Sequence, residues 1–145
     1  MNRTSKKLVL LESPFAGDTE AHLAYCRAAM RDCFDRGEIP FASHALYTQA
    51  GVLDDLNPRE RALGIGGGFA WGAHASMTVV YCDRGISRGM RLGILDALRA
   101  RRPIVLRSVA ANAGAIAHAA EIVERLRLAG ARAIARGRAR GRRAA

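Results

Sequence analysis

One glycine-rich turn in the sequence combines small residues, a hydroxyl group and arginines in a pattern that suits anion binding. Residues 85–90 read Gly-Ile-Ser-Arg-Gly-Met and include Ser87, Arg88 and Gly89. They follow an apolar, β-branched run and precede a helical pattern, so free backbone N–H groups and the positive end of the helix dipole would face a ligand. We interpret this turn as a site for a phosphate or ribose phosphate. The alternative is that Ser87 only caps the helix and that the glycines only turn the chain.

Four acidic residues are candidates for catalytic work on a sugar. Asp83 ends the apolar run before the turn, where a carboxylate suits hydrogen bonding to sugar hydroxyls, although an Asx turn is the alternative. Asp54 and Asp55 lie in the long connection of residues 44–57 and are adjacent like charges, which cost energy unless they are exposed or bound. Solvated turn residues are an equal alternative for this pair. Glu60 is interpreted as a helix cap that could also be catalytic.

His44 and Tyr47 are the candidates for contact with a base. Both lie in the connection of residues 44–57, where their rings could stack on a base or donate protons. Trp71 is expected to belong to the core and not to stack on a base. The other histidines, His22, His74 and His118, are expected to be surface or core residues without a ligand.

The sequence indicates no cofactor and no metal. It contains neither a P-loop nor a GxGxxG fingerprint that follows a strand. Cys26, Cys33 and Cys82 are odd in number, lack CxxC spacing and have no paired histidines nearby, which argues against a disulfide framework or a zinc site. We therefore expect reduced and mostly buried thiols.

The elements that must position these residues alternate between strands and helices. Apolar runs predict strands at residues 7–12, 39–42, 77–82 and 103–107, and Asp18, Asn57, Ser87 and Asn112 mark helix starts. This order predicts an α/β fold: a doubly wound, flavodoxin- or Rossmann-like, mainly parallel sheet of four to five strands with helices on both faces. Pro40 places the second strand at an edge of the sheet.

The strand order decides where a ligand would bind. With the order 2-1-3-4, the winding reverses between the first and third strands, and ligands bind at the carboxyl ends of the strands beside that point. The loops there are residues 13–18 and 83–90. The predicted helix that starts at Asn57 contains several glycines that cost up to about 1 kcal/mol each relative to Ala, so we expect close packing to hold it.

The chain of 145 residues is interpreted as one domain, residues 1–130, followed by a basic tail, residues 131–145. The net charge is +10, but the tail holds six arginines and no acid, which leaves 17 basic and 13 acidic residues in the domain, a charge of +4. The tail could bind nucleic acid or could be a solvated, frayed segment. No apolar run approaches the roughly 18 residues of a membrane span, so a cytoplasmic protein that does not enter a membrane is expected.

Several segments resemble a known superfamily. Residues 10–18, LLESPFAGD, resemble the SPY/F-x-G-D opening of the nucleoside 2-deoxyribosyltransferase-like superfamily, which also contains nucleoside-monophosphate N-glycosidases. The segments SHALYTQ, LDD, ERALGI, AW and DRGISRGM resemble a small uncharacterised family of phages and bacteria within that superfamily. The resemblance covers residues 7–107, and its motifs are specific when taken together.

The resemblance implies a doubly wound sheet, often in a homo-oligomer of two or more chains, with a nucleoside or nucleotide at the two loops. The binding residues it implies, together with the base and phosphate candidates above, are Ser13, Pro14, Phe15, Gly17, Asp18, His44, Tyr47, Gly85, Ser87, Arg88, Gly89 and Met90.

The family's enzymes use a glutamate in a G-T-x-x-E pattern, which attacks the anomeric carbon and forms a glycosyl intermediate. Alignment of residues 89–92 with that pattern puts Gly93 where the glutamate belongs. This favours a nucleotide-binding protein without turnover. The alternative is an N-glycosidase or transferase that acts on a nucleoside monophosphate, with Asp83 orienting the sugar and a carboxylate from Asp54, Asp55 or Glu60. A third reading is a nucleic-acid-associated protein that acts through its basic tail.

Overall fold

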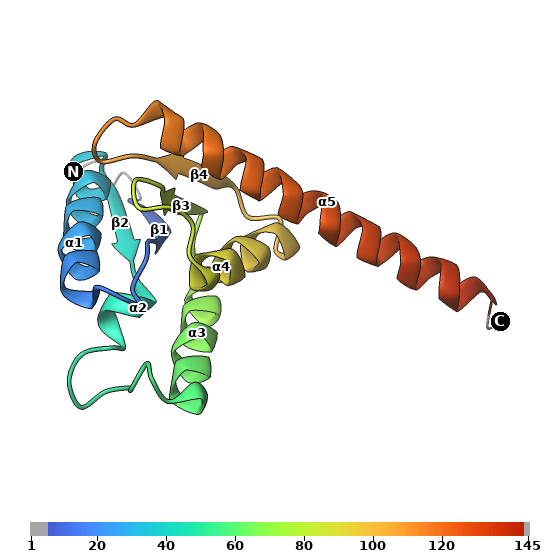
Figure 1. Ribbon diagram of the computed structural model, residues 1–145, viewed down its shortest axis with the longest axis horizontal. Coiled ribbons are helices and arrows are strands. Elements are labelled where there is room, and N and C mark those ends of the chain that lie inside the picture. Colours follow the sequence, from blue (N-terminus) through green and yellow to red (C-terminus); the bar gives the residue numbers. More distant parts are fainter. Residues whose placement is uncertain (1–5, 144–145) are drawn as a thin grey trace.

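A computed structural model of the chain describes residues 6–143 and shows a four-stranded parallel sheet flanked by helices (Figure 1). The sheet has the order β2-β1-β3-β4, which is the order on which the expected ligand position depends, and β2 lies at an edge, as predicted. The elements in chain order are β1 (Lys7–Glu12), α1 (Thr19–Asp35), β2 (Glu38–Phe41), α2 (Ser43–Leu46), α3 (Pro58–Gly72), β3 (Met77–Tyr81), α4 (Arg88–Arg99), β4 (Ile104–Arg107) and α5 (Ala113–Arg143). The short helix α2 lies in the connection that the sequence pattern left without an element.

Helices cover both faces of the sheet, which confirms the predicted fold class. On one face, Val9 and Leu11 of β1 pack with Cys26 and Cys33 of α1. On the other face, the cluster comes from β3, α4 and α5 and contains Val80, Cys82, Met90, Ile94, Ala119 and Val123. Successive side chains of a strand point to opposite faces. In β1, Leu10 and Glu12 therefore point away from α1, toward α3 and α4.

Side-chain caps start the helices at the predicted residues. The Asp18 carboxylate accepts from the Ala21 amide at 3.1 Å, and the Asn57 side chain accepts from the Arg59 amide at 3.0 Å. Ser87 Oγ accepts from the Met90 amide at 3.2 Å, and Asn112 accepts from the Ala115 amide at 3.0 Å. Each cap satisfies an amide that the first turn of a helix leaves without a partner, so the local sequence fixes these boundaries.

The glycines of α3 permit close packing, as expected. A Cβ at Gly67 would lie 2.9 Å from the Tyr47 ring, and one at Gly68 would lie 2.8 Å from Ser43 Oγ. Because these glycines carry no side chain, α2 and the loop after it pack directly on α3. This contact closes one side of the cavity described below.

Two expectations about individual side chains have different outcomes. Cys26, Cys33 and Cys82 are buried and free, as predicted. The expectation that Trp71 belongs to the core is wrong, because its side chain is 49% exposed. Its ring packs against Phe41 of the edge strand β2 at a centroid distance of 5.0 Å, and its Nε1 donates to the Tyr47 hydroxyl at 3.0 Å.

The basic C-terminal segment is helical and continues α5. Residues 131–143 follow residue 130 without a break, and Figure 1 shows this part of α5 extending away from the sheet. The boundary that the charge pattern placed at residue 130 is therefore not a boundary of secondary structure, because Ala and Arg are strong helix formers. Residues 144–145 of the predicted tail lie outside the described residues. No helix within residues 6–143 is long and apolar enough to span a membrane.

Candidate functional site

A cavity of about 140 Å³ lies at the carboxyl end of β1. The end of β1 and the loop after it, α2 and the loop after it, α3 and the first turns of α4 form its walls. This is the place at which the strand order predicts a ligand, because the connections from β1 and β3 leave the sheet there in opposite directions.

The structure brings together many of the predicted site residues, but not all. Those that line the cavity are Ser13, Phe15, His44, Tyr47, Asp55, Glu60, Ser87, Arg88, Gly89 and Met90. Those outside its lining are Pro14, Gly17, Asp18, Asp54, Asp83 and Gly85.

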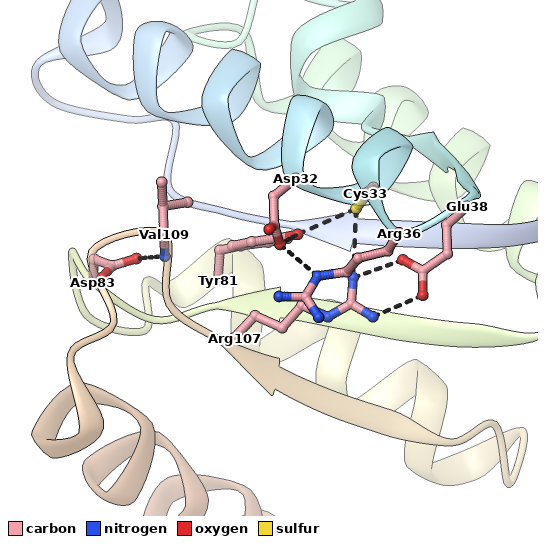
Figure 2. Close-up of polar contacts among 8 residues, drawn as sticks. All are labelled: Asp32, Cys33, Arg36, Glu38, Tyr81, Asp83, Arg107 and Val109. Carbon is pink, nitrogen blue, oxygen red and sulfur yellow. Dashed lines mark hydrogen bonds and ion pairs between the residues drawn. The ribbon is translucent and has the colours of Figure 1, made fainter.

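Asp83 lies outside the lining because groups of the protein surround its carboxylate. It accepts from the Tyr25 hydroxyl at 2.5 Å, the Ser108 hydroxyl and the backbone amides of Val109 (2.9 Å) and Ala110 (3.3 Å). Figure 2 shows the contact with Val109. Burial raises the pKa of Asp83, but these hydrogen bonds outweigh burial and lower the pKa to about 2. The carboxylate thus ties the loops after β3 and β4 to α1.

The first turn of α4 offers hydrogen-bond donors to the cavity. The backbone amides of Arg88 and Gly89 have no acceptor among the described residues, whereas those of Met90 and Arg91 bond to Ser87. Unpaired amides at the start of a helix, together with the helix dipole, form a site for an anion. Ser87 therefore acts as the cap that the alternative interpretation proposed, and it also lines the cavity.

Arg61 adds a positive charge beside this turn. Its guanidinium Nη2 lies 3.4 Å from the position of a Cβ on Gly89, and its Nη1 pairs with Asp55 at 2.5 Å. The pairing with Asp55 fixes the guanidinium next to the free amides. Arg61 was not among the predicted site residues, although its place one residue after Glu60 and one helical turn before Gly64 was a usable signal.

Three of the predicted catalytic carboxylates lie within residues 54–60, and each forms a hydrogen bond or an ion pair with a neighbouring group of the protein. Asp55 is paired with Arg61. Glu60 accepts from the backbone amide of Asp54 at 2.6 Å and from the Asn57 side chain at 3.4 Å, so it braces the loop. Asp54 accepts from the amide of Leu56 at 2.9 Å, outside the cavity lining.

His44 is an uncharged imidazole at the cavity wall. Its Nε2 lies 2.8 Å from Ser13 Oγ, and burial lowers its pKa to about 4. The ring is therefore neutral at pH 7, and it can accept or donate a single hydrogen bond from each nitrogen. Within residues 6–143, no group of three or more His, Cys, Asp or Glu side chains could hold a metal ion.

Glu12 is a further carboxyl group in the cavity, and it was not among the predicted site residues. It is the last residue of β1, it lines the cavity beside Gly93 of α4, and its carboxyl has no hydrogen bond or ion pair among the described residues. Burial raises its pKa to about 8; Arg102 lowers it and Asp96 raises it further, by smaller amounts. The usable signal was a glutamate at the end of an otherwise apolar strand, directly before the Ser-Pro loop.

Comparisons with known proteins place the chain in a family. Among solved structures, it is similar to a 2-deoxyribosyltransferase from the psychrotolerant bacterium Bacillus psychrosaccharolyticus, with 17% identity, 70% coverage of this chain, 72% coverage of that chain and a TM-score of 0.50. At this identity the likeness is one of fold. No curated protein matches the sequence. Residues 7–107 match the family described as a domain of unknown function (DUF7768), and because this match spans most of the sequence, the chain belongs to that family.

Proposed function

We propose that the cavity binds a nucleotide, with the phosphate at the start of α4 and the sugar and base in the interior. The observation that carries this proposal is the group of donors at one wall: the free amides of Arg88 and Gly89 beside the guanidinium of Arg61. Hydrogen bonds between charged donors and phosphate oxygens are short and about twice as strong as neutral ones. A phosphate completes this group, and an uncharged ligand does not.

The remaining walls suit a base. Phe15, Phe41, Leu53, Ile65 and Phe69 give the cavity apolar surface. His44 and Tyr47 add ring edges with polar atoms at the same wall. Apolar walls with a few placed polar groups are typical of small-molecule sites.

The structural neighbour supports a nucleoside ligand by analogy. That protein is described as a 2-deoxyribosyltransferase and a biocatalyst for the synthesis of nucleosides. Its fold is shared with this chain, and the cavity here lies at the switch point of that fold. The analogy bears on the ligand class and not on turnover.

Calorimetric titration with a panel of nucleosides and their 5′-monophosphates tests the proposal. We expect each monophosphate to bind about tenfold or more tightly than its nucleoside, since a charged hydrogen bond contributes roughly 1.5–3 kcal/mol. Arg61→Gln should remove most of that difference. Arg59→Gln is the matched control, because Arg59 is exposed on the same helix and does not line the cavity. Equal affinity for a nucleoside and its monophosphate would remove the phosphate site.

A second candidate function is cleavage or transfer of the N-glycosidic bond of a nucleoside monophosphate. The observation that favours it is Glu12, a carboxyl group in the cavity without a protein partner among residues 6–143. Release of free base from a panel of nucleoside monophosphates, measured by chromatography, distinguishes turnover from binding alone.

Two further properties stay predictions. Homo-oligomerisation is expected from the resemblance, and light scattering after size-exclusion chromatography measures it. Nucleic-acid binding is expected, if present, from the basic end of α5, and a truncation described in the Discussion tests it.

A further inference from the structure

We propose that Glu12 is the catalytic acid of this cavity and donates a proton to the base of a bound nucleotide as the N-glycosidic bond breaks. The inference rests on the proposed nucleotide-binding function. The reacting carboxyl group is then on β1. The sequence had indicated other candidates for this role, Asp54, Asp55, Glu60 and Asp83.

The position of Glu12 depends on the pleat of β1 and on a glycine in α4. Glu12 pairs in register with Val80 of β3, and its side chain points to the face that α4 covers. A Cβ on Gly93 would overlap the Glu12 carboxyl, so the absence of a side chain at residue 93 opens the space that the carboxyl fills. The carboxyl thereby reaches the cavity beside the first turns of α4, close to the proposed phosphate site.

Glu12 is available for a ligand, whereas the other acidic groups of the cavity are engaged. Asp55 is paired with Arg61, and Glu60 holds the Asp54 amide. No hydrogen bond or ion pair to Glu12 occurs within the part of the chain that the structure describes. Glu12 is partly buried and lines the cavity, so its carboxyl can contact a ligand that enters. A titratable group of this kind at a cavity wall is typical of a functional site.

The surroundings of Glu12 keep its proton in place at neutral pH. Burial raises its pKa to about 8. Arg102 lowers the pKa of Glu12 by less than burial raises it. Its guanidinium donates instead to Asp96 at 2.5 Å, to Thr78 Oγ1 at 2.8 Å and to the carbonyl of Gly72 at 3.0 Å. Asp96 raises the pKa of Glu12 slightly. A carboxylic acid with a pKa near the working pH is suited to donate and regain a proton.

The reaction balances with water as the co-reactant. The bond between the anomeric carbon and the base nitrogen breaks, its electron pair stays with the base, and the base takes the proton from Glu12. Water enters the space that the base leaves, adds to the anomeric carbon and gives a proton to the Glu12 carboxylate, which restores the acid. The products are free base and sugar phosphate, and no bond forms between the sugar and the protein.

The test compares wild type with Glu12→Gln in two measurements, base release from nucleoside monophosphates and calorimetric binding of the same compounds. Gln has nearly the shape of Glu but cannot act as an acid. We expect base release by wild type, a loss of roughly 100-fold or more in Glu12→Gln, and a change in affinity of less than about tenfold. Glu124→Gln is the matched control, since Glu124 is exposed on α5 and does not line the cavity, and the activity of this variant should equal that of wild type.

Each result separates the inference from the function on which it rests. If wild type binds monophosphates but releases no base, or if Glu12→Gln is as active as wild type, the acid role is wrong and nucleotide binding stands. If no monophosphate binds, the proposed function itself fails. A sugar phosphate attached covalently to Glu12 during turnover, located by peptide mass spectrometry, would make Glu12 a nucleophile and overturn the acid role.

A pH profile of wild type requires no variant and so does not depend on how Glu12→Gln folds. An acid must be protonated to act, so the rate of base release should fall as the pH rises through about 8, the pKa of Glu12. A rate that increases through this range would contradict the inference.

Discussion

The carboxyl group of Glu12 occupies the space in which a side chain at residue 93 would begin. A Cβ on Gly93 would overlap both Oε1 and Cδ of Glu12, although the two residues belong to β1 and α4. In the enzymes that the sequence resembles, the nucleophilic glutamate aligns with residue 93 of α4, which is glycine in this chain. In this chain a carboxyl group reaches the same region from the neighbouring strand, so a glutamate at both positions would have no room.

The first prediction concerns the energetic coupling of these two residues. In a Glu12→Ala background, Gly93→Ala should stabilise the protein by up to about 1 kcal/mol, because Ala is the better helix former. With Glu12 present, the new methyl group must displace the carboxyl, and the gain should vanish or reverse. A double-mutant cycle from urea unfolding measures the coupling, which we expect to be about 0.5–3 kcal/mol.

Gly66→Ala is the control for this cycle. Gly66 lies in α3, and a Cβ there would have no atom within 4 Å. Its effect should be the same in both backgrounds. An equal effect of Gly93→Ala in both backgrounds would contradict the contact between Glu12 and Gly93.

The second prediction is a pH dependence of stability that originates at Glu12. The pKa of Glu12 is about 8 in the folded chain, whereas a glutamate exposed to water has a pKa of 4.5. Between these values the folded state keeps a proton that the unfolded state has lost, so the free energy of unfolding falls as the pH rises, by at most about 1.4 kcal/mol per pH unit. The fall ends above the folded pKa.

Glu12→Gln removes this dependence. The difference in melting temperature between Glu12→Gln and wild type should therefore grow in favour of the variant as the pH rises from 5 to 8. His44 also titrates, with its folded pKa lowered to about 4, but its effect is common to both proteins and cancels. A difference that is constant with pH would show that Glu12 is ionised in the folded protein.

The third prediction separates a structural from a ligand-binding role for Asp83. Asp83→Asn replaces an acceptor oxygen with a donor that would face the Tyr25 hydroxyl or the Val109 amide, both of which are donors. We expect a loss of about 1–3 kcal/mol in unfolding free energy and little change in nucleotide affinity. If calorimetry instead shows lost affinity with stability retained, Asp83 contacts the ligand as the sequence analysis proposed.

The fourth prediction concerns the buried ion pair between Arg107 of β4 and Glu38 of β2. Figure 2 shows the two guanidinium nitrogens of Arg107 on the two carboxylate oxygens of Glu38, at 2.6 and 2.8 Å. Both side chains are 9% exposed. Because loss of one partner leaves a buried charge uncompensated, Glu38→Gln should cost about 3–5 kcal/mol in urea unfolding.

The exposed pair of Arg31 and Asp35 provides the comparison. Its side chains are 78% and 56% exposed, so Asp35→Asn should cost less than about 1 kcal/mol. Similar costs for Glu38→Gln and Asp35→Asn would mean that water reaches the Glu38–Arg107 pair.

The fifth prediction concerns the basic end of α5. Deletion of residues 131–145 removes six arginines, and the described side chains in this segment are exposed. The melting temperature and nucleotide affinity should stay nearly unchanged. Retention on a DNA column should fall and lose most of its salt dependence, because each neutralised phosphate contributes about 0.9 to the slope of log K against log salt. Unchanged retention would place DNA binding on another surface, and an unfolded truncation would show that the segment is structural.

The sequence by itself determined the order of the elements and the region of the site. Apolar runs marked the strands, and the caps Asp18, Asn57 and Ser87 marked the helix starts, because a cap acts on amides only two or three residues away. With the order 2-1-3-4, the switch between β1 and β3 placed the ligand site at the loops after these two strands. The end of α5 was not predictable in this way, since its Ala- and Arg-rich sequence contains no stop signal strong enough to end the helix near residue 130.

Only the tertiary structure decided which carboxyl group faces the cavity. Glu12 and Asp83 both follow apolar strand residues and look alike in the sequence. The Asp83 carboxylate meets Ser108 and Tyr25, which come from a different loop and a different helix, whereas the Glu12 carboxyl meets the space left by Gly93. The pleat and register of β1 against β3 and the packing of α4 on that face create these contacts. These contacts join segments that are far apart in the chain. No local pattern around Glu12 could therefore show that its carboxyl fills the space beside Gly93.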